Sequence, residues 1–143
     1  VVIVGYGHVG QRIANALNEK DIPYIIAEQN RELVQDLRKQ GKNAVSGDAT
    51  EPSVLIQAHI TDAAMLVVAT SDPLDVRQMI DTARTLNPSI EIVLRTRSED
   101  ETKLLRKDKI GTVFFGEEEL AKSMTHHILD RFNAKSESTH KES

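Results

Sequence analysis

Short apolar runs alternate along the chain with segments in which apolar residues recur every three to four positions. Most of the runs are uniformly apolar, which is typical of strands in a parallel sheet that is covered on both faces. They predict strands at residues 1–4, 24–27, 44–46, 65–69, 90–94 and 112–115. The segments between them show one apolar face each, as at Val9, Ile13 and Leu17, and these predict helices.

This alternation predicts an α/β fold, a Rossmann-like doubly wound sheet of six parallel strands. Because crossovers between parallel strands are right-handed, the expected strand order is 3-2-1-4-5-6. The boundaries of the helices have their own signals: Gly41 ends the second helix, Ser71 or Asp72 ahead of Pro73 marks a helix start, and Ser98 with Glu101 forms a capping-box pattern. A chain of 143 residues suits one such domain.

Both ends of the chain carry further expectations. The first residue, Val1, already belongs to a strand-like run and no initiator Met or leader precedes it, so we expect the chain to be part of a longer protein. Residues 133–143 contain a single Ala among polar residues, and this composition predicts a disordered polar tail or linker. The expected folded domain therefore covers residues 1–132.

The turn after the first strand carries a glycine-rich motif of the form G-x-G-x-x-G. Its residues are Gly5, Tyr6, Gly7, His8, Val9 and Gly10. In such a loop the first glycine permits a tight turn, the second lets backbone approach a phosphate and the third lets helix and strand pack closely. Glu28 follows the second strand, where a carboxylate can accept hydrogen bonds from a ribose diol and repel a 2′-phosphate. Together they predict nucleotide binding; glycines kept only for packing in an empty fold are the alternative.

Other polar residues lie at strand ends, where ligands of open α/β sheets bind. Asp48 and the amide of Ala49 could read the edge of adenine, whereas Asp48 and Thr50 could equally cap a helix. Thr70 and Ser71 follow the fourth strand, and their hydroxyls could meet a phosphate, although capping is an even alternative for Ser71.

Two arginines and several histidines complete the candidates. Arg95 or Arg97 at the end of the fifth strand could close over a phosphate, and a surface ion pair is an equal alternative for Arg97. His8 would lie at the edge of the ligand. His126 and His127 are neighbours on one helix and point about 100° apart, so they suit neither a metal pair nor a relay. We predict no catalytic residue and no metal site.

Composition narrows the classes of function. The sequence contains 18 Lys and Arg residues and 22 Asp and Glu residues, and the resulting net charge of −4 disfavours nucleic acid as a partner. The absence of Cys excludes disulfides, thiolate metal sites and Cys nucleophiles. No apolar run approaches the roughly 20 residues that span a bilayer.

The last predicted helix, at residues 117–132, has an apolar stripe that is too long to remain exposed to solvent on an isolated domain. The stripe consists of Leu120, Ala121, Met124, Ile128 and Phe132. We expect it to cross to a partner subunit and form a homodimer, with packing on its own sheet edge as the alternative.

Five segments in this order carry a resemblance to a known family. They are GYGHVG at 5–10, AEQN at 27–30, GDAT at 47–50, VATSD at 68–72 and LRTR at 94–97. The chain resembles the nucleotide-binding N-terminal half of an RCK domain, the TrkA-N family, over residues 1–132. The Gly-Tyr-Gly-His form and the segment 114–117 look most like the cytosolic ends of Kef-type cation/proton antiporters.

The resemblance implies a regulatory domain that is not an enzyme and that binds an adenine nucleotide, AMP or NAD(H). It also implies a dimer that biases the transmembrane portion of a potassium or other cation transporter, at the cytoplasmic face of the bacterial inner membrane. Carried over by position, the site comprises Gly5, Tyr6, Gly7, His8, Val9, Gly10, Glu28, Gln29, Asp48, Ala49, Thr70, Ser71 and Arg95.

Enzymes on similar folds are the rival interpretation. An NAD-dependent oxidoreductase is disfavoured because the residues four places after Tyr6 and Tyr24 are Gly10 and Glu28, so no Tyr-x-x-x-Lys pair is present. A methyltransferase seldom has the three-glycine loop, and the segment GDAT at 47–50 fits the sensor better.

Overall fold

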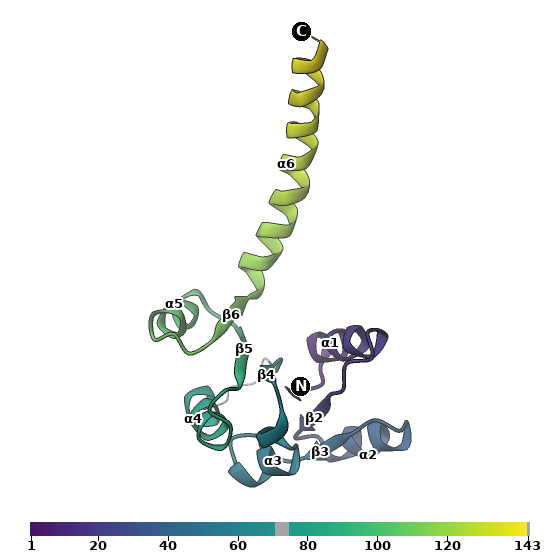
Figure 1. Ribbon diagram of the computed structural model, residues 1–143, viewed down its shortest axis with the longest axis vertical. Coiled ribbons are helices and arrows are strands. Elements are labelled where there is room, and N and C mark those ends of the chain that lie inside the picture. The colour runs from purple at the N-terminus through teal and green to yellow at the C-terminus, as the bar shows by residue number, and fades with distance from the viewer. Residues whose placement is uncertain (71–74, 143) are drawn as a thin grey trace.

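The six strands form one parallel sheet in the order β3-β2-β1-β4-β5-β6, as the crossover rule predicted (Figure 1). The computed structural model describes residues 1–70 and 75–142, with side chains to residue 133. Its strands are β1 (Val2–Val4), β2 (Ile25–Glu28), β3 (Ala44–Ser46), β4 (Met65–Val68), β5 (Glu91–Thr96) and β6 (Thr112–Phe115). The Rossmann-like α/β fold expected from the sequence is confirmed.

Helices cover the two faces of the sheet unequally. They are α1 (His8–Glu19), α2 (Arg31–Lys39), α3 (Pro52–Gln57), the short 3₁₀ helix η1 (Ile60–Asp62), α4 (Val76–Leu86), α5 (Glu99–Lys107) and α6 (Gly116–Glu142). The chain steps one way from β1 to β3 and the other way from β3 to β6, so right-handed crossovers place α1 and α2 on one face and α3, α4 and α5 on the other (Figure 1).

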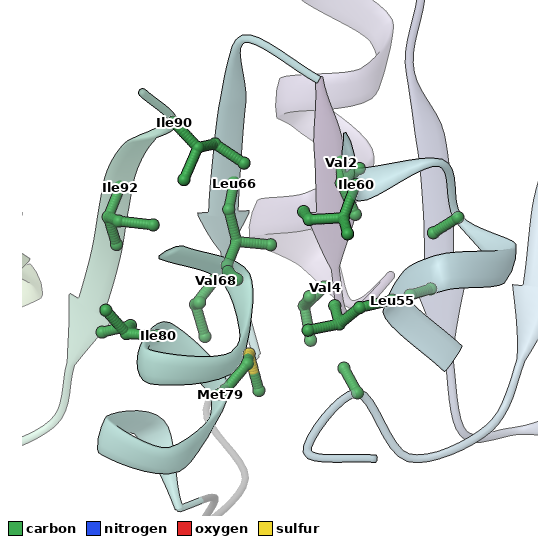
Figure 2. Packing of buried hydrophobic residues seen from close by; sticks show 14 of the residues in the cluster. Val2, Val4, Leu55, Ile60, Leu66, Val68, Met79, Ile80, Ile90 and Ile92 are labelled. Carbon is green, nitrogen blue, oxygen red and sulfur yellow. The ribbon is translucent and has the colours of Figure 1, made fainter. Parts of the chain in front are cut away.

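Two aliphatic cores follow from this arrangement. On the side of α3 and α4, side chains such as Leu55, Leu66 and Met79 are fully buried and pack together (Figure 2). On the side of α1 and α2, a smaller cluster forms around Ile3 and Ile26. Both cores are built almost entirely without aromatic rings, and Tyr6 is the one aromatic residue that the structure buries among its described residues.

Several element boundaries have clear local causes. β5 continues to Thr96, two residues beyond the predicted end, because Thr96 pairs with Phe115 and its Oγ1 lies 2.6 Å from Oγ1 of the buried Thr102. The predicted cap of α5 is confirmed, since the Ser98 hydroxyl accepts from the Glu101 amide. α4 begins after Asp75, and the start signal predicted at residues 71–73 lies outside the described residues.

Helix α6 leads away from the sheet instead of packing on its edge (Figure 1). Its 27 residues correspond to about 40 Å at 1.5 Å per residue. The helix runs through residues 133–142, where the polar composition predicted a loose tail. No Gly or Pro follows Gly116, so nothing in the sequence interrupts helix propagation once it has started. Among the described residues, no helix combines the length and apolar character needed to cross a membrane.

Candidate functional site

A cleft of about 310 Å³ opens at the carboxyl ends of β1, β2 and β3. Its walls come from the glycine loop, the end of β2 and the first residues after β3 and β4. They consist of Val4, Gly5, Ala27, Glu28, Gln29, Gly47, Ala49 and Thr70. Parallel strands end together at this edge, so the topology itself gathers these residues from four separate turns.

Two glycines of the loop are required by the protein's own packing. Gly5 has φ of +94°, and a Cβ there would lie 2.7 Å from Cβ of Thr70. At Gly10 a Cβ would lie 2.2 Å from the carbonyl oxygen of Gly5, so only glycine lets α1 approach β1 this closely. Neither residue therefore needs a ligand to explain it.

Gly7 is different, because none of the described residues requires it to be glycine. Its φ is −85°, and a Cβ built there would meet no atom of the described residues within 4 Å. Gly7 is the N-cap residue of α1, and the side of the backbone that lacks a Cβ faces open space. Open space beside a helix start is what the close approach of a phosphate needs.

The start of α1 also lacks the protein groups that usually satisfy it. None of the side chains that the structure describes caps the helix, and its first turn contains no acidic residue. By contrast, Asn30, Asp75 and Ser98 cap α2, α4 and α5 with side-chain hydrogen bonds. The first amides of α1 and the positive end of its dipole thus remain available to an anion.

The carboxylate of Glu28 is fixed beside this helix start. Its Oε1 accepts from the amide of Tyr6 at 3.1 Å and its Oε2 accepts from the amide of Asn30 at 2.6 Å. Glu28 is half-buried in the wall of the cleft. Each carboxylate oxygen keeps a further lone pair, so the group can still accept from the hydroxyls of a ligand.

The cleft brings together only part of the predicted site. Gln29, Ala49 and Thr70 line it alongside Gly5 and Glu28, and His8 is exposed at the start of α1. Asp48 does not line it. Its Oδ1 accepts from both the amide and the hydroxyl of Thr50, at 2.9 and 2.8 Å, which fixes the turn after β3. Neither residue caps α3, whose N-cap is Glu51 without a side-chain hydrogen bond.

Three other predicted residues do not line the cleft, and a fourth lies outside the described residues. The Tyr6 side chain is only 8% exposed and lies in the core between α1 and α2. Val9 and Arg95 line a second hollow, and the Arg95 guanidinium donates to the carbonyl of Ala69 at 3.3 Å. Ser71 lies outside the described residues.

Val4, Ala27 and Gly47 line the cleft without having been predicted from sequence, and Asn30 contributes through its backbone. Gly47 lines the cleft with φ of +145°, and a Cβ there would lie 2.6 Å from a methyl group of Val54. Its place directly after β3 was the available signal. The backbone amide of Asn30 donates a hydrogen bond to Glu28. Such a bond could not be predicted from the sequence, because nearly every residue type has a backbone amide.

The second hollow is an apolar groove of about 630 Å³ on the α1 side of β4, β5 and β6. Because α1 and α2 cover only the other half of this face, side chains such as Val93 and Phe114 stay open to solvent in part. Phe114 is 42% exposed. The groove reaches Gly116 and Glu119 at the start of α6, and Val9 of α1 forms its opposite wall.

One arginine of α5 contacts the start of α6. The Arg106 guanidinium donates to the Glu118 carboxylate and to the carbonyl of Val113, both at 2.8 Å. The hydrogen bond from Arg106 holds the pKa of Glu118 below its ordinary value, aided by the charges of Arg106 and Lys122. The apolar stripe of α6 is exposed; its large members are Leu120 (62%), Met124 (58%), Ile128 (49%) and Phe132 (60%). Leu129, which the predicted stripe did not include, is 52% exposed.

The sequence matches the model of the TrkA-N domain over residues 1–115. Among curated proteins, a putative cation/proton antiporter YbaL of Escherichia coli K12 is 32% identical over 123 residues, which is 86% of this chain. The chain spans 22% of that relative's length. A crystal structure of the TrkA-N domain of the E. coli inner membrane protein YbaL superposes with a TM-score of 0.80 and 32% identity, covering 87% of this chain and 93% of that one.

Two more distant structures share the fold. The Kef C-terminal domain of Shewanella denitrificans in its AMP-bound form has a TM-score of 0.75 at 20% identity, covering 92% of this chain and 79% of that one. The GsuK channel bound to NAD has a TM-score of 0.66 at 23% identity, covering 78% of this chain and 20% of that one.

Proposed function

The chain belongs to the TrkA-N domain family, and we propose that it is a regulatory domain that binds an adenine nucleotide without transforming it. One observation carries the proposal: within residues 1–70 and 75–142, no side chain caps the start of α1, and no packing contact requires Gly7 to be glycine. A phosphate seated there would take the free amides and the positive end of the helix dipole.

The same cleft suits the rest of an adenosine phosphate. Glu28 would accept hydrogen bonds from the ribose hydroxyls, and its charge would repel a 2′-phosphate, so NADP is disfavoured. Ala49 and Gln29 would border the adenine. Thr70 would lie near the phosphate, with Ser71 and Arg95 on its far side. AMP and NAD(H) are the ligands we favour, since related folds have been solved with AMP and with NAD.

We further propose that the domain regulates a monovalent cation/proton antiporter or channel at the cytoplasmic face of a bacterial inner membrane. The chain spans 22% of the antiporter-like relative, and the rest of such a protein would contain the transport pathway. A nucleotide can shift the pathway only if it binds one arrangement of the domains better than another. The moving element must then touch both the cleft and a neighbouring subunit.

Helix α6 is our candidate for that element, in a homodimer. Leu120, Met124 and Ile128 are exposed at a spacing of four residues, which forms one apolar stripe along the helix. The open groove beside Phe114 offers a complementary apolar surface on a second copy. Val9 lines this groove from the first turn of α1, so an occupant of the groove would lie next to the nucleotide cleft.

The proposal predicts binding without turnover. AMP or NAD at one hundred times its Kd should stabilise the purified chain by about 2.7 kcal/mol, seen as a higher Tm, because ligand binds only the folded state. Chromatography should recover the nucleotide unchanged. Consumption of NAD or NADH with any co-substrate would favour the oxidoreductase alternative instead.

The dimer proposal predicts a specific loss of association. Met124→Asp places a charge in the middle of the apolar stripe and should give monomers in analytical ultracentrifugation, while nucleotide binding per chain persists. Ser123→Asp adds the same charge at an exposed position on the polar side of the helix, away from the stripe, and this control should stay dimeric. A Met124→Asp chain that remains dimeric would remove α6 from the interface.

A further inference from the structure

Glu28 is oriented before any ligand arrives. Both of its carboxylate oxygens accept from backbone amides, one from Tyr6 and one from Asn30. Asn30 also caps α2 through its side chain, which accepts from the amide of Leu33 at 3.1 Å, so this donor is fixed by a helix. The other donor belongs to the glycine loop, and its position depends on what holds the loop.

Tyr6 is the residue of the loop whose side chain anchors it. The ring is only 8% exposed and packs with Ala14, Ile26 and other residues of the α1 and α2 core. The hydroxyl accepts from Nζ of Lys42 at 3.2 Å, and that ammonium lies 5.7 Å from the centre of the ring. The Lys42 backbone is itself held, because its amide donates to the carbonyl of Leu37 at the end of α2.

Three connections therefore meet at Tyr6. Its ring ties the loop to the core, its hydroxyl ties the loop to the turn between α2 and β3, and its amide holds Oε1 of Glu28. The side chain points away from the cleft and does not line it. A direct contact between the phenol and a ligand in the cleft is thus not what the geometry offers.

We infer that Tyr6, fixed by Lys42, is a positioning residue that holds the Glu28 carboxylate in place to read the ribose hydroxyls. This inference rests on the proposed nucleotide function. Its consequence is that damage at Tyr6 weakens the recognition of the ribose more than the binding of the phosphate. A residue that merely supports the fold would weaken the binding of every nucleotide by the same factor.

The test compares AMP with 2′-deoxy-AMP, which differ only in the hydroxyl. Because a hydrogen bond to a charged group is stronger than one between neutral groups, the wild-type chain should bind AMP about tenfold or more tightly than 2′-deoxy-AMP. Glu28→Ala should abolish most of this preference. Tyr6→Ala should reduce it by a similar factor, measured as the ratio of the two Kd values, although Glu28 is still present.

Tyr24→Ala is the matched control. Tyr24 is half-buried against the same core but lies ahead of β2, among residues that line a different pocket from the cleft. Its truncation should lower the Tm and leave the AMP to 2′-deoxy-AMP ratio as in the wild type. Lys42→Met keeps the tyrosine ring and removes the ammonium that donates to its hydroxyl and lies over the ring, so it should lower the ratio in the same direction by a smaller factor.

The outcomes separate the two proposals. If the wild-type chain prefers AMP and Glu28→Ala loses the preference, but Tyr6→Ala and Lys42→Met keep it, the positioning role is wrong and the proposed function stands. If Tyr6→Ala does not fold, Lys42→Met decides alone. If the wild-type chain binds neither nucleotide, the proposed function itself is wrong and the positioning role falls with it.

Discussion

Gly7 and Gly10, three residues apart at the end of the first loop, have different roles. At Gly10 the missing side chain lets α1 pack against the carbonyl of Gly5, which is a requirement of the fold. At Gly7 the missing side chain leaves open space at an uncapped helix start, which we assign to a ligand. The same residue type thus serves stability at one position and binding at the other, and substitution can tell them apart.

Gly10→Ala should destabilise the protein and Gly7→Ala should impair its binding. The Cβ at residue 10 would force backbone atoms apart, at a cost of about 1–3 kcal/mol, visible as a lower Tm. The Cβ at residue 7 would meet no atom of the described residues within 4 Å, so the Tm should fall by less, while the affinity for AMP or NAD should fall about tenfold, or 1.4 kcal/mol. Thermal unfolding and calorimetry on both variants check this; a Gly7→Ala chain with wild-type affinity would contradict the assignment of the phosphate.

At the level of single residues, the sequence predicted the glycine loop and Glu28, because three glycines followed at this spacing by a carboxylate are typical of nucleotide binding. It could not predict the hydrogen bonds from Thr50 to Asp48, since a carboxylate at this position fits a helix cap, a turn and adenine recognition alike. It also placed Tyr6 in the site by position alone. The direction of its ring depends on core packing against α2, which neighbours in the sequence do not encode.

Among the elements, α6 is held to the domain by its junction with β6 and by Arg106. The guanidinium bridges a carbonyl at β6 and a carboxylate of α6, and Gly116 lies at the joint, where a Cβ would meet nothing. The sequence predicted the helix and its apolar stripe from periodicity. Its direction could not be predicted, because it depends on a contact between α5 and α6 that no periodic pattern reports.

The Arg106 contact predicts a pH-dependent orientation of α6. The pKa of Glu118 is lowered in the folded protein, so the contact is present at neutral pH and is lost in acid as the pH falls through that lowered pKa. Spin labels at residues 103 and 125, in the Met124→Asp background that should be monomeric, should then give a broader distance distribution in acid.

Arg106→Gln should give the broad distribution already at neutral pH. The matched control is Arg84→Gln, because Arg84 also donates to a carbonyl, that of Ile110, but does not touch α6. A narrow distribution for Arg106→Gln at neutral pH would show that the junction with β6 alone directs the helix.

For the whole molecule, one topological fact links the cleft to the apolar groove. The reversal of the chain path after β3 gathers the strand ends into a cleft and leaves half of the α1 face uncovered. The glycine loop connects the two, because Gly5 lines the cleft while Val9, four residues later in α1, lines the groove with Ile13. The strand order was predictable from the alternation of strands and helices and from the right-handed crossovers. The open groove was not, because the sequence pattern does not report how much of this sheet face α1 and α2 cover.

The central claim is that the cleft binds adenosine phosphates through the α1 start and Glu28, and calorimetric titration with AMP, NAD and NADP tests it most directly. AMP or NAD should bind, NADP should bind more weakly, and Glu28→Ala should lose about tenfold or more in affinity. Glu32→Ala, which removes an exposed acid from the first turn of α2, should leave the affinity unchanged. Absence of binding, or equal affinity for the wild type and Glu28→Ala, would contradict the account.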